Sequence, residues 1–212
     1  RGQPRQWCQR FSRGHRTPHT VLAGLSQPSG VAQRLARERY ESNVVLVDPV
    51  AAPPSNVIVV GQGRFGQTVA QMLIGHGFAV VSIDKKPAQI EVSQRFDTKV
   101  YYGDGTRIDL LRRAGAEGAG ALLFCMDDKN FGPDQIAPIA HAFPEAQLFV
   151  RANDRRQLLA LKHAPIAAAQ RELFESSVKL AHTALLRTGI DPIVADRVVE
   201  EFRKRDCERL EM

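Results

Sequence analysis

The chain has 212 residues, of which 43% are hydrophobic, and this suffices for one good core or for one domain with an appended subdomain. Its apolar runs, such as Val57–Val60 and Ala121–Cys125, have the length of strands and fall far short of the ~20 residues that a membrane-spanning helix needs. We therefore expect these residues to form a soluble protein, with a formal net charge of +6.

The positive charge is confined to residues 1–43, which carry eight arginines and two glutamates. The remaining residues carry 21 basic and 21 acidic side chains and are therefore neutral overall. A basic tail can contact phosphates or anionic lipids, but a solvated arm is the simpler interpretation, and we predict no nucleic-acid partner. A DNA- or RNA-binding protein stays an alternative; a steep salt dependence of binding that disappears on deletion of residues 1–43 would support it.

Residues 48–55, "DPVAAPPS", predict a linker, because Pro-Pro is extended and cannot continue a helix. Residues 1–55 are thus predicted to be a basic, disordered tail followed by a proline-rich linker.

Regular alternation of strands and helices begins at Val57. The apolar runs predict strands at 57–60, 79–83, 99–102, 121–125 and 147–150. The segments between and after them predict helices at 65–74, 87–96, 108–114, 134–142 and 154–163. Apolar strands that alternate with helices of about ten residues indicate a parallel sheet covered on both faces. Right-handed crossovers then give a Rossmann-like, doubly wound α/β domain over residues 56–164.

The pattern changes over residues 165–212. The segment "APIAAAQRE" is a poor strand, in which only Ile166 is β-branched. A long amphipathic helix follows and ends at Gly189, and a second helix has Asp191 as its N-cap and Pro192 at its first position. Because this helical pair has to bury its apolar faces somewhere, we expect a C-terminal helical extension that dimerises.

The stretch "VIVVGQGRFGQ" places Gly61, Gly63 and Gly66 directly after a strand and at the start of a helix. The first glycine permits a tight turn, the second lets a pyrophosphate approach the backbone, and the third lets helix and strand pack closely. Asp84 follows the second strand, where an acid binds ribose hydroxyls. Its carboxylate would repel a 2′-phosphate, which favours NAD(H), AMP or ATP over NADP(H), although Lys85 and Lys86 lie close enough to weaken this preference.

The segment "GDGTR" after the third strand adds further candidates. Asp104 could accept from a ribose or an adenine amino group, Thr106 could cap the next helix, and Arg107 could meet a phosphate. The alternative is a simple turn with an exposed arginine. After the fourth strand, Met126 is a candidate to pack on adenine, and Cys125 is expected to be a buried strand residue rather than a nucleophile.

The sequence offers no catalytic residues or motifs to accompany this ligand site. A dehydrogenase needs a second domain that places substrate and proton donor at the nicotinamide, and only about 60 residues follow the fifth strand. His141, His163 and His182 stand isolated, and no Walker lysine, HExxH or GxSxG occurs. A sensor is therefore favoured over an enzyme. A small NAD-dependent oxidoreductase is the alternative, and it would require a proton donor facing the nicotinamide.

Several segments together carry a family resemblance: "PSNVIVVGQGRFGQTVAQML", "VVSIDKKPAQIE", "KVYYGDGTRIDLLRRAGA", "LLFCMDD", "FPEAQLFVRAND" and "RELFESSVKLA". They closely resemble the TrkA-N (RCK/KTN) domain, and most of all the regulatory domain of Kef-type glutathione-gated potassium-efflux systems. The resemblance implies a Rossmann-like dimer that binds NAD(H) or AMP. It also implies a place on the cytoplasmic face of the inner membrane, where the domain would gate a K⁺/H⁺ antiporter.

The resemblance also implies site residues. The nucleotide site would comprise Gly61, Gln62, Gly63, Arg64, Phe65, Gly66, Asp84, Lys85, Asp104, Gly105, Thr106 and Arg107. A glutathione site in a cleft between subunits would use Arg171, which matches the family's R-E segment. Asp206 stands in "FRKRD" where the family has an asparagine, and a carboxylate facing an anionic tripeptide costs affinity unless Arg203 or Arg205 compensates.

Overall fold

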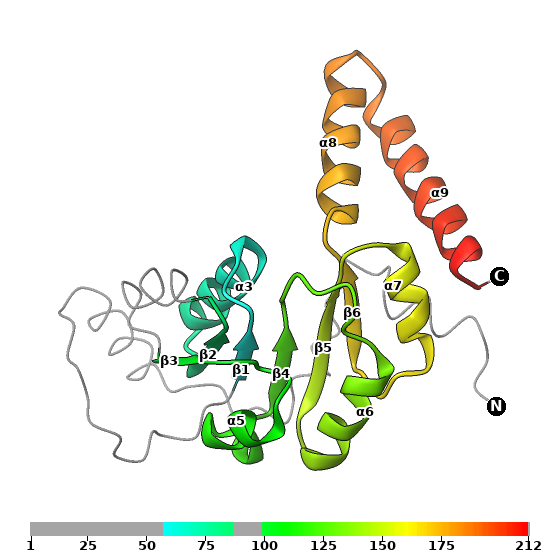
Figure 1. Ribbon diagram of the computed structural model, residues 1–212. Coiled ribbons are helices and arrows are strands. Elements are labelled where there is room, and N and C mark those ends of the chain that lie inside the picture. Colours follow the sequence, from blue (N-terminus) through cyan, green and yellow to red (C-terminus); the bar gives the residue numbers. More distant parts are fainter. Residues whose placement is uncertain (1–56, 87–98, 212) are drawn as a thin grey trace.

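The sheet consists of six parallel strands. The computed structural model describes residues 57–86 and 99–211, and Figure 1 shows its arrangement. The strands are β1 (Val57–Val60), β2 (Val80–Asp84), β3 (Lys99–Tyr102), β4 (Ala121–Phe124), β5 (Gln147–Ala152) and β6 (Ala168–Arg171). Their order in the sheet is β3-β2-β1-β4-β5-β6, and every neighbouring pair is parallel. This confirms the prediction of a Rossmann-like, doubly wound α/β fold.

Helices connect and follow these strands. The α-helices are α3 (Arg64–Gly75), α5 (Ile108–Arg113), α6 (Pro133–Ala142), α7 (Arg155–Ala160), α8 (Phe174–Arg187) and α9 (Pro192–Glu211). Two short 3₁₀ turns are η1 (Ala116–Gly118) and η2 (Leu161–His163). None of these described helices is long and apolar enough to cross a membrane. The predicted helix at 87–96 and the predicted tail and linker over residues 1–55 lie outside the described residues.

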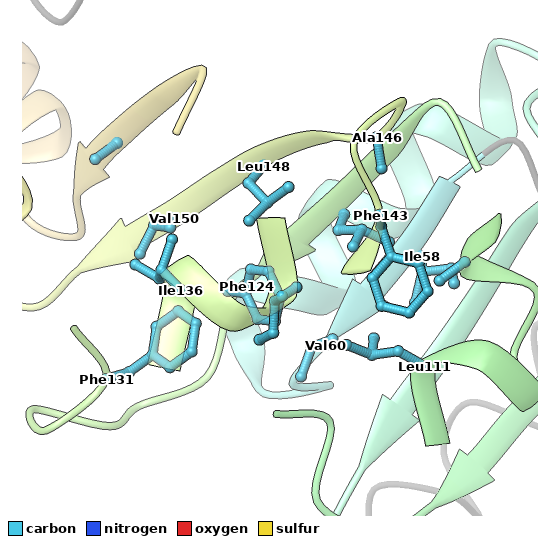
Figure 2. Packing of buried hydrophobic residues seen from close by; sticks show 14 of the residues in the cluster. Ile58, Val60, Leu111, Phe124, Phe131, Ile136, Phe143, Ala146, Leu148 and Val150 are labelled. Carbon is cyan, nitrogen blue, oxygen red and sulfur yellow. The ribbon is translucent and has the colours of Figure 1, made fainter. Parts of the chain in front are cut away.

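The core occupies both faces of the sheet because alternate side chains of each strand point to opposite sides. All four residues of β1 are buried, as a central strand requires. The larger core cluster joins the strands to α5 and α6, and Figure 2 shows part of it, with Phe124 and Phe131 packed 4.8 Å apart between ring centroids. A smaller cluster on the other face packs Val57 and Val59 against Ala70 of α3. Burial of apolar surface stabilises a fold by about 25 cal/mol per Å², and it is the main favourable term that holds these layers together.

The strand order creates a switch point between β1 and β4. The chain runs outward through β1, β2 and β3, and then returns through α5 to place β4 on the other side of β1. The helices that follow β1 and β4 therefore leave on opposite faces and part at the carboxyl edge, which is where doubly wound sheets bind ligands.

The segment over residues 165–173 does enter the sheet, despite its weak strand pattern. Residues 168–171 form β6 and pair with β5 from Phe149↔Ala168 to Ala152↔Arg171. An edge position makes this possible, because β6 needs hydrogen bonds from one neighbour only, and Ala169 is small enough to be buried against α7.

Beyond β6, helices α8 and α9 form a hairpin that projects away from the sheet (Figure 1). The turn between them follows the predicted caps: Gly189 has a φ of +90°, and the Asp191 carboxylate accepts from the backbone N–H of Ile193 at 2.9 Å. At the far end of α9, Leu210 is buried in the larger core cluster. The hairpin is thus anchored at both ends on the sheet domain.

Candidate functional site

The glycine loop lies at the carboxyl edge of β1. Gly61 has a φ of +94°, and a Cβ there would lie 2.6 Å from the backbone N of Met126. A Cβ on Gly66 would lie 1.8 Å from the Gly61 carbonyl oxygen. By contrast, a Cβ on Gly63 would meet nothing within 4 Å. The protein itself therefore requires the first and third glycines, whereas the second leaves open space over the N-terminus of α3, where backbone N–H groups are available to an anion.

Asp84, at the end of β2, is held against this loop. It is 8% exposed, and its carboxylate accepts from the Gln62 backbone N–H at 2.5 Å and from the Lys86 backbone N–H at 2.7 Å. A carboxylate has about four lone-pair sites, so these two bonds leave acceptor capacity for a ribose hydroxyl. Lys85 is exposed beside it. The predicted acid thus lies directly next to the predicted phosphate loop.

The loop after β3 forms a compact turn next to Asp84. Asp104 accepts from both the backbone N–H (3.0 Å) and the hydroxyl (2.8 Å) of Thr106. The Thr106 backbone N–H, together with the hydroxyl and the charges of Lys85 and Arg107, lowers the pKa of Asp104 below its usual value. A Cβ on Gly105 would lie 2.3 Å from Val60, so this turn is packed against the end of β1. Asp104 is therefore an ionised, exposed acceptor at the crevice.

Two details of this turn differ from the sequence interpretation. The predicted helix cap at Thr106 was wrong, because its hydroxyl is engaged by Asp104 and the N-cap of α5 is Arg107, with no side-chain capping bond. Arg107 pairs with Asp109 through bonds of 3.1 and 2.9 Å instead of reaching across the crevice. Its side chain is 66% exposed, so a ligand phosphate would have to compete with an exposed ion pair that is worth little.

The remaining loop residues flank the crevice on the α3 and β4 sides. Arg64 is exposed at the first position of α3, Phe65 is half-buried, and Gln62 is buried. Met126, which follows β4 by two residues, is partly buried and packs against the larger core cluster. Cys125 is buried, and burial raises the pKa of its thiol to about 12, which supports its interpretation as a structural residue.

The two candidate residues for the regulatory ligand meet, although they lie 35 positions apart. Arg171, at the end of β6, forms a two-pronged ion pair with Asp206 of α9; its Nη1 lies 3.2 Å from Oδ1, and its Nη2 also bonds the carboxylate. Both side chains are 14% exposed. The Arg171 guanidinium also lies 4.0 Å from the ring centroid of Phe174. Asp206 therefore already pairs with the guanidinium that a regulatory anion would need to bind.

The two arginines that could compensate for Asp206 are paired as well. Arg203 donates to both carboxylate oxygens of Glu175 at 2.6 Å, and these bonds raise its pKa. Arg205 donates to Glu201 at 2.9 Å on the exposed face of α9. An incoming anion would meet neutralised arginines unless it displaced a carboxylate.

Two cavities border the helical hairpin. One of about 490 Å³ is mostly apolar and is lined by Arg171, Phe174, Leu185 and Phe202, among others. A larger one of about 1050 Å³ lies between β4–β6 and the two helices, and its lining includes Phe65 of the glycine loop. The expectation that His182 is isolated was wrong, because its Nε2 lies 2.8 Å from Asp196 in this larger cavity.

Sequence reasoning missed Arg151, a buried cation in β5. It is 8% exposed, and its Nη1 donates to the Cys125 carbonyl at 3.1 Å while its Nη2 pairs with Glu172. The available signal was a charged residue at the end of the apolar run "LFV". Lys, Arg, Asp and Glu are almost never fully buried unless they are paired, so a partner could have been expected but not identified.

Comparison with known proteins places this geometry in a family. The TrkA-N domain matches residues 57–171. A glutathione-regulated potassium-efflux system protein of Haemophilus influenzae is 35% identical over 164 residues, which is 77% of this chain and 26% of the relative. The KefC protein of Klebsiella pneumoniae is 34% identical over the same shares. The chain thus spans about a quarter of the length of these curated relatives.

Solved structures agree in fold. The C-terminal domain of Shewanella denitrificans Kef in its AMP-bound form superposes with a TM-score of 0.63 at 36% identity, covering 73% of this chain and 94% of that one. The TrkA-N domain of the Escherichia coli inner membrane protein ybaL superposes with a TM-score of 0.56 at 14% identity, covering 61% and 96%, and shows likeness of fold alone.

Proposed function

The chain belongs to the TrkA-N domain family, and we propose that it is the nucleotide-sensing regulatory domain of a potassium-efflux system. The relatives that match 77% of this chain are named for glutathione-regulated potassium efflux. In this proposal the domain acts from the cytoplasmic face of the inner membrane on a K⁺/H⁺ antiporter, which a longer or separate chain supplies.

One observation carries the nucleotide part of the proposal. The buried Asp84 carboxylate bonds the Gln62 backbone N–H, next to the open space over Gly63. A phosphate over Gly63 would meet the N–H groups and the positive end of the α3 dipole. A ribose would then lie within reach of Asp84, and its hydroxyls would donate to the free lone pairs. The related Shewanella domain is described in an AMP-bound form, which supports an adenine nucleotide as the ligand.

The same carboxylate gives the proposed preference among nucleotides. Asp84 accepts from a 2′-hydroxyl and repels a 2′-phosphate, so NAD(H) and AMP should bind better than NADP(H). Lys85 and Lys86 are exposed beside it and reduce the margin through screened attraction to a phosphate. We expect a preference of roughly tenfold, which corresponds to about 1.4 kcal/mol.

Dimerisation through the helical hairpin is the second part of the proposal. Leu180 is 72% exposed and Ile193 is 78% exposed, and Val198 and Phe202 of α9 are about half exposed. We take these exposed apolar side chains on a projecting hairpin as the basis for an interaction surface. A second copy of this chain is the proposed occupant, because a symmetric pair would let each hairpin cover the other.

Glutathione sensitivity is the third part. We propose that a glutathione-type anion acts only by displacing Asp206 from Arg171, because that ion pair already satisfies the guanidinium. Such competition raises the ligand concentration that is needed for a response.

In this proposal the nucleotide is read rather than consumed. The ligand changes the balance between two arrangements of the dimer, and the shift equals its difference in binding free energy between them. Turnover of NAD(H) with any metabolite would instead support the small-oxidoreductase alternative.

Calorimetric titration tests the proposal. The 212-residue chain would be titrated with AMP, NADH and NADPH, beside Asp84→Asn and the control Asp128→Asn, which alters a loop acid that bonds the Asn130 backbone N–H. We expect AMP and NADH to bind, the Asp84→Asn variant to lose tenfold or more in affinity (about 1.4 kcal/mol), and the control to match the unaltered chain. Absence of AMP and NADH binding by the folded chain would refute the nucleotide assignment.

A further inference from the structure

Arg151 lies between the nucleotide crevice and the start of the C-terminal hairpin. On the crevice side, its guanidinium carbon is 5.5 Å from the ring centroid of Phe65, the second residue of α3. Its Nη1 donates to the carbonyl of Cys125 at 3.1 Å. The Cys125 backbone N–H in turn donates to the Val60 carbonyl at 2.7 Å, directly before the glycine loop. Arg151 therefore contacts both the loop and the strand end that supports it.

On the other side, the same guanidinium holds the chain just before α8. Its Nη2 pairs with Glu172, which lies two residues before the first residue of that helix. The Glu172 backbone N–H also donates to the Ala152 carbonyl at 3.0 Å, and Asp127 lies 3.8 Å from Nη2. One planar cation thus connects Phe65, the end of β4 and the entrance to α8.

The stability of the fold alone does not explain why Arg151 is buried. Within the described part of the chain, the buried Nε of Arg151 has no hydrogen-bond partner, and a buried ion pair often contributes less than a well-packed apolar side chain would. A planar, rigid fork is nevertheless suited to transmitting position, because it fixes the relative placement of several groups at once.

We propose that Arg151 is a positioning residue that couples nucleotide occupancy of the glycine loop to the order of α8. The inference rests on the proposed function, because it requires a nucleotide at Gly63. A phosphate that binds the start of α3 restricts Phe65; the Phe65 face then restricts the guanidinium, and Glu172 passes the restriction to α8. Coupling of this kind requires a difference in freedom between the two ligand states and no large movement.

Hydrogen–deuterium exchange measured by mass spectrometry on the 212-residue chain, with and without saturating AMP, tests the coupling. The variants are Arg151→Lys, which keeps the charge and loses the fork, and Glu172→Gln, which keeps Arg151 and weakens its hold on α8. Arg112→Gln is the matched control, because it removes an exposed arginine–glutamate pair that bonds at 2.8 Å elsewhere. AMP affinity is measured for each protein by calorimetry.

We expect AMP to slow exchange over residues 174–187 of the unaltered chain and of the control by roughly fivefold or more, the lower range of measured couplings between sites. In Arg151→Lys and Glu172→Gln, AMP should still bind and slow exchange at 61–67. Its effect on the exchange of residues 174–187 should fall below about half of the effect in the unaltered chain. Full protection of 174–187 in a folded, AMP-binding variant overturns the inference, as does AMP binding without such protection in the unaltered chain.

These outcomes separate the inference from the proposed function. If AMP does not bind the unaltered chain, the proposed function fails and the coupling fails with it. If Arg151→Lys does not fold, Glu172→Gln decides the matter, because Glu172 is 29% exposed and its substitution replaces the ion pair with a weaker, neutral hydrogen bond.

Discussion

The carboxylate of Asp84 accepts a 2.5 Å hydrogen bond from the backbone N–H of Gln62, although the two residues lie 22 positions apart. The bond joins the end of β2 to the glycine loop that follows β1. The acid for a ribose and the N–H groups for a phosphate are therefore placed together before any ligand binds. Such preorganisation reduces the entropy that a ligand must give up on binding.

Replacing the glycines of the loop one at a time should separate binding from folding. Gly63→Ala should leave the free energy of unfolding within about 0.5 kcal/mol of the unaltered value, because its φ of −67° suits alanine and no atom lies within 4 Å of the new Cβ. Its affinity for AMP should fall at least tenfold, about 1.4 kcal/mol, since the methyl group enters the space that we assign to the phosphate. Denaturant unfolding and calorimetry measure the two effects.

Gly66→Ala serves as the contrasting variant. Its Cβ would lie 1.8 Å from the Gly61 carbonyl oxygen, so helix and strand would have to separate, at a cost of about 3 kcal/mol or more. Normal AMP binding by the Gly63→Ala variant would show that the open space is not the phosphate site.

Asp206→Asn should strengthen the response to glutathione. Removing the carboxylate leaves the Arg171 guanidinium with a neutral partner and returns its charge to the cleft. We expect glutathione affinity to rise roughly fivefold, about 1 kcal/mol, with a loss of about 1–3 kcal/mol in stability. Glu201→Gln, which removes the partner of Arg205 on the exposed face of α9, should change neither quantity. Equal glutathione affinity in all three proteins would contradict the proposed competition.

The hairpin surface predicts a concentration-dependent dimer. Leu180→Glu and Ile193→Glu place charges on strongly exposed apolar positions, so each should raise the dimer dissociation constant at least tenfold, about 1.4 kcal/mol. Leu159→Glu on α7, where the side chain is 37% exposed, is the control that should keep the dimer. Sedimentation velocity measures the association. A dimer that survives both hairpin substitutions would place the interface elsewhere.

The buried thiol of Cys125 should be unreactive. Its pKa is raised to about 12 by burial, so the folded state keeps the proton that an unfolded thiol of pKa ~8.5 releases. The contribution to stability is therefore constant below about pH 8.5 and is lost as the pH rises toward 12. At pH 8, alkylation of Cys125 should be at least ~10³-fold slower than in denatured protein, as measured by mass spectrometry of its peptide. A rate within tenfold of the denatured value would contradict this assignment.

Local patterns predicted most of the sheet. β-Branched and apolar runs located β1 to β5 within two residues at each end. The helix predicted after β5 starts behind Asp154, whose carboxylate accepts from the Gln157 backbone N–H. The exception is β6, because its hydrogen bonds to β5 rather than its own alanines hold it in place.

Interactions between distant residues were not predictable in the same way. The pairing of Arg171 with Asp206 spans 35 positions, and that of His182 with Asp196 depends on the hairpin geometry. Arg107 was predicted as a phosphate ligand from its place after β3, but Asp109 competes for it at close range. Composition and spacing identify which groups can interact, whereas tertiary packing selects among the possible partners.

A structure of the 212-residue chain with AMP would locate the nucleotide site directly. We predict the phosphate over the Gly63 backbone at the start of α3, and ribose hydroxyls that donate to the Asp84 carboxylate. AMP bound outside this crevice, or a ribose that makes no contact with Asp84, would contradict this prediction.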